Sequence, residues 1–209
     1  MFKNISFAFA LSYCCTGMAQ THDLPPLQNG DLLFQDMDCG PICNAIEEVT
    51  EGFDGHDFSH IGLVTIQKDS IFILEAIGKD VHLTPLATFL ARSGNKVYVG
   101  RVKQAFRPLA QKAVKVALGY KGIPYDDVFI YNNKKYYCSE MIYDAFKKAN
   151  RNKPFFTLEP MTFRMPGSDT YYPVWVSYYA DLKMDIPEGK PGINPGGISR
   201  SSKITILNK

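Results

Sequence analysis

The sequence predicts an α+β fold in which helices pack against a largely antiparallel sheet. Two adjacent segments, 59–67 (SHIGLVTIQ) and 71–77 (IFILEAI), are rich in β-branched residues and are separated by a short turn, which is typical of a β-hairpin. Two later segments, 108–120 and 138–150, carry apolar residues at helical spacing. Helices mixed among hairpin-linked strands favour the α+β class.

The other expected elements are shorter. The sequence predicts a turn and strand over 29–36, a short helix and loop over 38–57, a short helix over 86–92, and strands over 96–102 and 202–207. The 209 residues are enough for one well-filled core but few for two full domains, so we expect one domain over residues 20–209. A net charge of +2, with no stripe of Lys and Arg, argues against nucleic-acid binding.

Residues 1–19 have the pattern of a secretory signal peptide. A lysine is followed by the apolar run ISFAFALSYCC and by small residues at 17 and 19, which predicts cleavage before Gln20. The protein is therefore expected to be exported, to the periplasm or the cell envelope. Two alternatives remain, a buried N-terminal helix and a lipoprotein modified at Cys14, whose preceding residues loosely resemble a lipobox.

Three cysteines remain after the predicted cleavage: Cys39, Cys43 and Cys138. Cys39 and Cys43 are close enough to pair if the intervening Gly-Pro turn brings their Cα atoms within about 7 Å, and the sequence leaves this open. These two cysteines have no further ligands at zinc-site spacing, so we expect no metal, and no organic cofactor is implied. An odd number of cysteines in an oxidising compartment leaves one thiol unpaired or paired between chains, and this is Cys138 if Cys39 and Cys43 pair.

Cys138 begins the predicted helix over 138–150 and shares its inward face with Met141 and Ile142. A buried cysteine usually acts as a small apolar residue. In the first turn of a helix, however, the helix dipole stabilises a thiolate, so Cys138 is a candidate nucleophile. Such a nucleophile needs a histidine base and a group that orients the base. Three of the four histidines stand where solvent exposure is expected: His22, His56 and His82.

The fourth histidine, His60, opens the first strand of the hairpin. If Ile66 lies opposite Ile71, then Gly62 faces Glu75, and Glu75 is diagonal to His60 at about 7–8 Å between backbones. A two-residue loop would place the pair directly opposite, and a slip of one residue would separate them. A carboxylate flanked by isoleucines requires a partner, and His60 is the nearest candidate. The alternative is that Glu75 is an edge charge and His60 a core residue.

Six segments together resemble a known family. In order they are NGDLLFQ, FSHIGLV, ILEAIG, VYVGRV, GIPYDD and YYCSEMIYDAF, and the resemblance extends over roughly residues 28–201. They resemble the circularly permuted papain-like amidases of the YiiX/YaeF type, a branch of the NlpC-like cell-wall peptidase superfamily. The resemblance implies a permuted papain-like fold with the nucleophile at a helix N-terminus and the histidine before the cysteine in the chain.

The resemblance also implies roles for individual residues. Cys138 matches the nucleophile, His60 the base, Glu75 the orienting residue, and Tyr125 a tyrosine that lines the site. We therefore expect an exported cysteine hydrolase that cleaves an amide or ester through a thioester. Its expected substrates are a cell-wall peptide or peptidoglycan fragment, or a lipid-linked amide or ester, and it could associate with the cell envelope. The alternatives are an acyltransferase and an inactive binding module.

Aromatic residues are concentrated between 155 and 179. Eight stand among these 25 residues, whereas the chain average of 13% predicts about three. They could form the wall of a substrate cleft or the core beneath the C-terminal segment. Trp175 in this segment, together with Tyr125 and Tyr137 before the nucleophile, are the candidate substrate-binding residues.

Overall fold

The computed structural model describes residues 24–93 and 97–208, so the predicted signal peptide and His22 lie outside the described residues. A six-stranded antiparallel sheet in the order β4-β3-β2-β1-β5-β8 forms the centre of the fold. Its strands are β1 (Leu32–Gln35), β2 (His60–Gln67), β3 (Ser70–Ile77), β4 (Asp80–Pro85), β5 (Tyr98–Val102) and β8 (Ile204–Ile206). The predicted α+β class and antiparallel sheet are confirmed.

The β2–β3 hairpin adopts one of the two registers that the sequence left open. Ile66 pairs with Ile71, and the ladder runs from Leu63↔Leu74 to Gln67↔Ser70. The chain reverses through the two residues Lys68 and Asp69, which both adopt positive φ angles, so the expectation that a two-residue loop would place His60 directly opposite Glu75 is wrong. Glu75 therefore lies on the same face of the sheet as His60, diagonally across the hairpin.

Gly62 is needed at its position on β2 because a side chain there would collide with the next strand. A Cβ atom at Gly62 would lie 2.2 Å from Ile73 Cγ2 and 3.1 Å from Phe89 Cε2, but 3.7 Å from Glu75 Cβ. The glycine therefore makes room mainly for the apolar neighbours rather than for the His60–Glu75 contact.

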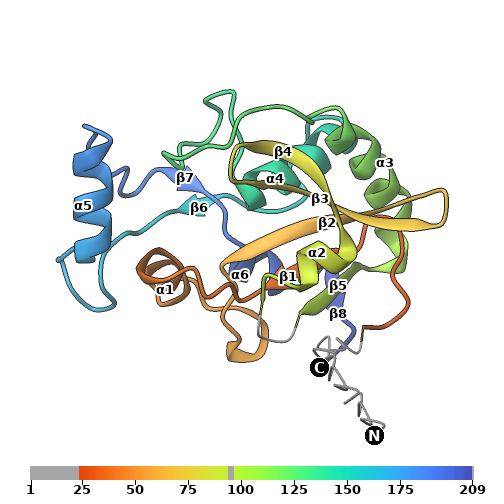
Figure 1. Ribbon diagram of the computed structural model, residues 1–209, viewed down its shortest axis with the longest axis horizontal. Helices are drawn as coiled ribbons and strands as arrows, with labels where there is room; N and C mark the ends of the chain where they lie inside the picture. Colours follow the sequence, from red (N-terminus) through yellow and green to blue (C-terminus); the bar gives the residue numbers. More distant parts are fainter. Residues whose placement is uncertain (1–23, 94–96, 209) are drawn as a thin grey trace, which may run out of the picture.

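Helices cover the two faces of the sheet (Figure 1). The long helices α3 (Arg107–Leu118) and α4 (Cys138–Ala149) pack on one face, where Leu32, Phe34, Ile61, Leu63 and Leu74 form the main core. The short helix α2 (Leu86–Leu90) packs on the other face, against Leu33, Val64, Ile73 and Val99. The strands are apolar on both sides because neither face is left to solvent.

The remaining elements lie outside the six-stranded sheet. They are α1 (Pro41–Glu47), the 3₁₀ turns η1 (Phe53–Gly55) and η2 (Gln104–Phe106), the two-residue strands β6 (Glu159–Pro160) and β7 (Pro191–Gly192), α5 (Pro173–Asp181) and α6 (Pro195–Ser199). Figure 1 shows α5 at the edge of the molecule, joined to the rest by the segments that contain β6 and β7. None of the helices in the described part has the length and apolarity that crossing a membrane requires.

Cys39 and Cys43 form a disulfide with 5.4 Å between their Cα atoms. Gly40 between them has a φ angle of 80°, which glycine adopts without strain, and Pro41 begins α1. The turn that the pairing required is therefore present, and Cys138 is the free cysteine of the described residues.

Candidate active site

Cys138 is the first residue of α4, and the local sequence fixes the start of this helix. Tyr137 before it is extended, with φ −89° and ψ 170°. The carboxyl of Glu140 accepts the backbone N–H of Asn132 at 2.8 Å and interacts with the backbone N–H of Tyr137. A glutamate three residues into a helix that reaches back in this way forms half of a capping box. Burial raises the pKa of Glu140 to about 8, so it is a largely neutral, structural carboxyl at pH 7.

His60 lies between the sulfur of Cys138 and the carboxylate of Glu75. Its Nε2 is 2.7 Å from Glu75 Oε2, and the Cys138 side chain lies close enough to the ring to raise the pKa of His60. Because Nε2 is bonded to Glu75, Nδ1 is the nitrogen left for the sulfur. Burial lowers the pKa of His60, but the bonds to Cys138 and Glu75 outweigh it and raise this pKa to about 9. The arrangement therefore favours an imidazolium at neutral pH.

Glu75 is completely buried and is held by a cation that the sequence did not reveal. Arg92 Nη2 lies 2.7 Å from each carboxylate oxygen of Glu75. Burial raises the pKa of Glu75, but His60, Thr84 and Arg92 all donate hydrogen bonds to it and bring the pKa down to about 2. The carboxylate is consequently ionised over the whole physiological range.

Phe89 of α2 holds this ion pair in place from the side. The Arg92 guanidinium lies 5.1 Å from the centre of the Phe89 ring, and the same ring is 6.0 Å from the His60 ring. Such a cation–π contact restricts where the guanidinium can move. The residues that hold the His60 ring thus lie on the α2 side of the sheet, whereas Cys138 belongs to α4 on the opposite side.

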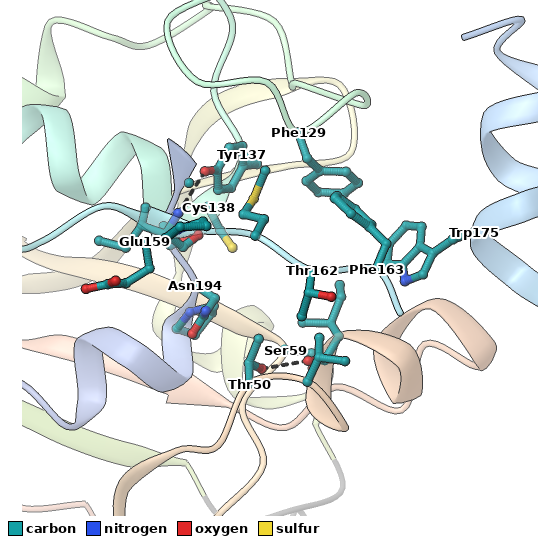
Figure 2. Close-up of a pocket in the computed structure, with 18 of the residues that line it drawn as sticks. Thr50, Ser59, Phe129, Tyr137, Cys138, Glu159, Thr162, Phe163, Trp175 and Asn194 are labelled. Carbon is teal, nitrogen blue, oxygen red and sulfur yellow. Dashed lines mark hydrogen bonds between the residues drawn. The ribbon is translucent and has the colours of Figure 1, made fainter. Parts of the chain in front are cut away.

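A pocket opens beside Cys138, which is 7% exposed (Figure 2). It contains about 810 Å³ of space between side chains, part of it open to solvent. Figure 2 shows the sulfur with Glu159 and Asn194 on one side and with Phe129, Phe163 and Trp175 on the other. The remaining lining residues are Ile46, Val49, Thr50, Ser59, Tyr125, Tyr137, Ser139, Pro160, Met161, Thr162, Gly192, Ile193 and Pro195.

The three candidate substrate-binding residues all line this pocket. Tyr125 lies close enough to Cys138 for a charged sulfur to act on it, and burial followed by this charge raises its pKa well above the ordinary value. Tyr137 is 3% exposed, and its hydroxyl accepts the backbone N–H of Ile193. Trp175 of α5 is 2% exposed.

The aromatic residues between 155 and 179 are divided between cleft and core. Phe163 and Trp175 line the pocket, whereas Phe155 stacks on Phe146 of α4 and Phe156 meets the same ring edge to face in the main core. Some residues of this segment thus belong to the core and others to the pocket wall.

The other two histidines of the described residues lie away from Cys138. His56 contacts the hydroxyl of Tyr98 at 2.9 Å through Nε2. His82 on β4 pairs with Asp80 at 3.0 Å, and its side chain is 45% exposed. The structure thus brings His60 alone, among these histidines, to the sulfur.

Sequence reasoning missed Arg92, Thr84 and most of the residues that line the pocket. The signal for Arg92 was the buried position of Glu75, because one imidazole leaves carboxylate lone pairs unsatisfied. The position of Arg92 in the sequence did not indicate this role, because a cation at the end of a short helix is usually exposed to solvent. Phe129 and Met161 belong to loops whose paths only the folded chain defines.

Comparison with known proteins identifies the family and the fold of this chain. Residues 26–207 match the family described as permuted papain-like amidase enzyme, YaeF/YiiX, C92 family. A protein of Escherichia coli K12, described as uncharacterized protein YiiX, is 31% identical over 124 residues, which are 58% of this chain and 58% of that protein. The alignment thus spans less than two thirds of that relative.

A solved structure from Escherichia coli O157:H7, described as that of metalloprotein YiiX, superposes with a TM-score of 0.70 at 25% identity and covers 87% of this chain and 97% of that chain. The fold of this chain is therefore shared with that protein over most of both lengths. Because the family match covers most of the sequence, this chain belongs to the permuted papain-like amidase family YaeF/YiiX, C92.

Proposed function

We propose that this protein is a cysteine amidase that cleaves an amide or ester bond through a thioester intermediate, with Cys138 as nucleophile, His60 as acid and base, and Glu75 as the residue that orients His60. The observation that carries the proposal is the position of the His60 ring, which is bonded to Glu75 and lies beside the Cys138 side chain. Membership in an amidase family supports the reaction class.

The reaction begins with attack of the Cys138 sulfur on the substrate carbonyl carbon, which forms a C–S bond. The backbone N–H of Cys138 stands at a helix N-terminus, where such groups have no partner within the helix, and it can donate to the developing oxyanion. His60 then gives its proton to the leaving nitrogen or oxygen, and the bond from that atom to the carbonyl carbon breaks. The product of this step is a thioester on Cys138.

The second half of the reaction uses water. Neutral His60 takes a proton from a water molecule, and the resulting hydroxide attacks the thioester carbonyl. The C–S bond breaks, a carboxylic acid leaves, and the Cys138–His60 pair returns to its starting state. Glu75 keeps its charge throughout and stabilises the imidazolium.

The similar E. coli structure is described as that of a metalloprotein. In residues 24–93 and 97–208 of this chain, no three or more His, Cys, Asp and Glu side chains gather in a group that could hold a metal ion. The donor set of the described residues does not fit such a site, so each step above uses side chains and water only.

Export belongs to the proposal as well. The pattern of residues 1–19 is that of a signal peptide, and the Cys39–Cys43 disulfide supports an oxidising compartment. A periplasmic or envelope location would bring the enzyme to peptidoglycan fragments and to lipid-linked amides or esters, the two substrate groups that we expect.

The proposal is tested by the reactivity of Cys138. At pH 6.5 we expect iodoacetamide to modify Cys138 about tenfold faster in the wild type than in His60→Ala, because the imidazolium stabilises the thiolate. The rate is measured by intact mass spectrometry. His82→Ala is the matched control, since its imidazole pairs with Asp80, and it should label like the wild type. Equal rates in wild type and His60→Ala would favour a binding module without chemistry.

A further inference from the structure

Arg92 follows a helix that is too short to fix its position. α2 contains five residues, and its C-cap residue, Ala91, directly precedes Arg92. The Arg92 side chain is 25% exposed, yet its Nη2 lies 2.7 Å from both carboxylate oxygens of Glu75. Short helices fray at their ends, where the last carbonyls lack partners within the helix. A contact from outside α2 is therefore needed to keep the guanidinium at the carboxylate.

The side chain of Gln35, the last residue of β1, makes such a contact. Its Nε2 donates a hydrogen bond of 2.8 Å to the backbone carbonyl of Phe89, near the end of α2. The same carbonyl accepts the backbone N–H of Arg92 at 3.3 Å. The Gln35 amide thus fixes the acceptor to which the backbone of Arg92 is bonded.

A second bond joins the same two segments on the other side of Arg92. The hydroxyl of Ser93 donates to the backbone carbonyl of Asp36 at 2.8 Å. Two consecutive residues at the end of β1 are thus bonded to residues before and after Arg92. We call these two bonds, Gln35–Phe89 and Ser93–Asp36, the β1 clamp. A backbone that is bonded on both sides moves little, so the guanidinium that it carries starts from a defined position.

Gln35 projects to the face of the sheet on which His60 and Glu75 stand. It lies opposite His60 in the β1–β2 ladder, and residues opposite each other in a ladder share a face. The ring of Phe89 is 6.0 Å from the His60 ring and 5.1 Å from the Arg92 guanidinium. One buried amide therefore holds the residue that contacts both the imidazole and the cation.

The burial of Gln35 indicates that its amide has a role beyond packing. The residue is completely buried, and its Oε1 has no hydrogen-bond partner within the described part of the chain. A buried polar atom without a partner is unfavourable, and an apolar side chain of the same length would avoid this cost. The benefit of a glutamine at this position therefore lies in the bond from its Nε2 to Phe89.

We propose that Gln35 is a positioning residue of the proposed active site: through the β1 clamp it holds the end of α2 so that the Arg92 guanidinium reaches Glu75 behind His60. This inference rests on the proposed function, because that function makes Glu75 the residue that orients the imidazole. Gln35 does not line the pocket, and it acts on the reaction through Arg92.

The first measurement is how firmly the Arg92 guanidinium is held. Exchange of guanidinium hydrogens with water is followed by NMR in isotope-labelled protein, and the Arg92 signals are those lost in Arg92→Met. Gln35→Met keeps the length of the side chain and removes the amide donor. We expect it to speed exchange at Arg92 by at least about threefold, because the bonds to Glu75 open more often. The signals of Arg101, which pairs with Asp31 at 2.7 Å, should not change.

Two further variants complete this measurement. Ser93→Ala removes the second bond of the β1 clamp and should speed exchange at Arg92 as well, so the test does not depend on the folding of Gln35→Met alone. Ser199→Ala is the matched control, since it removes a buried hydroxyl that donates to the Gly196 carbonyl at 2.6 Å and does not line the pocket. It should lower stability without changing exchange at Arg92.

Alkylation of Cys138 measures whether the position of Arg92 matters to the active site. At pH 6.5 we expect iodoacetamide to label Gln35→Met about threefold more slowly than the wild type, because Glu75 then orients His60 less firmly. In an Arg92→Met background the same substitution should slow labelling no further, since a residue that acts through Arg92 has no effect without it.

The possible outcomes separate this inference from the proposed function. The role of Gln35 would be overturned by unchanged exchange at Arg92 in both clamp variants, or by an equal increase at Arg92 and Arg101. Labelling of Gln35→Met at the wild-type rate, or further slowing in the Arg92→Met background, would overturn it too. If His60→Ala labels like the wild type, the proposed chemistry fails, whereas the exchange rates still show whether the β1 clamp holds Arg92.

Discussion

Glu75 shows how a single buried residue depends on its partners. Its carboxylate has no exposed surface and stands between isoleucines on its strand, where an unpaired charge would be very unfavourable. His60 and Arg92 supply two charged partners at 2.7 Å each. The residue that orients the imidazole is therefore itself oriented by a cation from the end of α2.

We expect Arg92→Met to lower kcat/KM by about tenfold or more and to move the acid limb of the pH–activity profile to higher pH. The reason is that Arg92 is one of the groups that hold the pKa of Glu75 near 2, so its loss lets Glu75 take up a proton at higher pH. Arg92→Lys should restore part of the activity.

Arg101→Met is the matched control for this experiment. Arg101 pairs with the buried Asp31 at 2.7 Å, is exposed to a similar extent (23% against 25% for Arg92), and lies on β5 outside the pocket. It should lose stability without any shift of the acid limb. A shift of the same size in both variants would show that the effect of Arg92 is only structural.

Glu75→Gln tests the effect of the Glu75 carboxylate on His60. Burial lowers the pKa of His60 while Cys138 and Glu75 raise it to about 9, so the imidazolium persists to that pH. Removing the negative charge lowers this pKa, and the alkaline limb of activity should move from about pH 9 to lower pH. The pH dependence of kcat/KM measures it, and an unchanged alkaline limb would contradict the role of Glu75.

The same pKa shift has a consequence for stability. Because the pKa of folded His60 lies above its unfolded value of about 6.5, its contribution is fully present below pH 6.5 and is lost as the pH rises through 9. In Glu75→Gln this loss between pH 6.5 and 9 should be smaller. Urea unfolding at the two pH values would measure it.

Among the elements, the β2–β3 hairpin and α4 were the most predictable from sequence. The β-branched segments predicted the two strands and the face that His60 and Glu75 share, and the apolar spacing of 138–149 predicted the inward face of α4. α5 was not predicted, because PVWVSYYAD is apolar on most sides and lacks a helical stripe. Its one signal was Pro173 at the first helical position.

β4 was only partly predicted. The segment VHLTP alternates weakly, and its pattern suggests a strand position for His82 without indicating a pairing partner. The strand forms because it pairs with β3 along its whole length, from Phe72↔Pro85 to Ile77↔Asp80. Pairing with a neighbouring strand thus decides the conformation of a segment whose own β-propensity is weak.

The Cys39–Cys43 disulfide closes the turn that begins α1, and Ile46 of this helix lines the pocket. It closes a loop of about five residues, for which chain-entropy arguments give roughly 2 kcal/mol. We expect the double variant Cys39→Ser, Cys43→Ser to lose about this much unfolding free energy in urea. The variant should also be insensitive to dithiothreitol, whereas the wild type should be destabilised by it. An equal effect of the reductant on both proteins would contradict this.

At the scale of the whole molecule, the proposed site is assembled from both faces of the sheet. α4 brings Cys138 from the main core, and the α2 side brings Phe89 and Arg92 behind His60 and Glu75. The contact is made where β2 begins, at His60. No single segment of the chain contains this arrangement. The contact of Arg92 with the His60–Glu75 pair could therefore not be derived from the sequence of the hairpin alone.

Export is a prediction about the whole chain. In a bacterial host we expect the mature protein to begin at Gln20, as intact mass spectrometry of the periplasmic fraction would show, and Ala19→Arg should block processing. Cys14→Ser should leave location and mature mass unchanged, because Cys14 lies within the removed segment. Loss of membrane attachment in Cys14→Ser would instead identify a lipoprotein.

The sequence by itself determined the α+β class and favoured hairpin registers that place His60 and Glu75 on one face, because these depend on residue alternation along neighbouring strands. Only the tertiary structure decided that the hairpin adopts the diagonal register, that Arg92 neutralises Glu75, and that the Cys138 side chain lies beside the His60 ring. The same holds for the apolar wall formed by Phe129, Met161 and Trp175. The physical reason is that these contacts join segments far apart in the chain, and their geometry is set by how the helices pack on the two faces of the sheet.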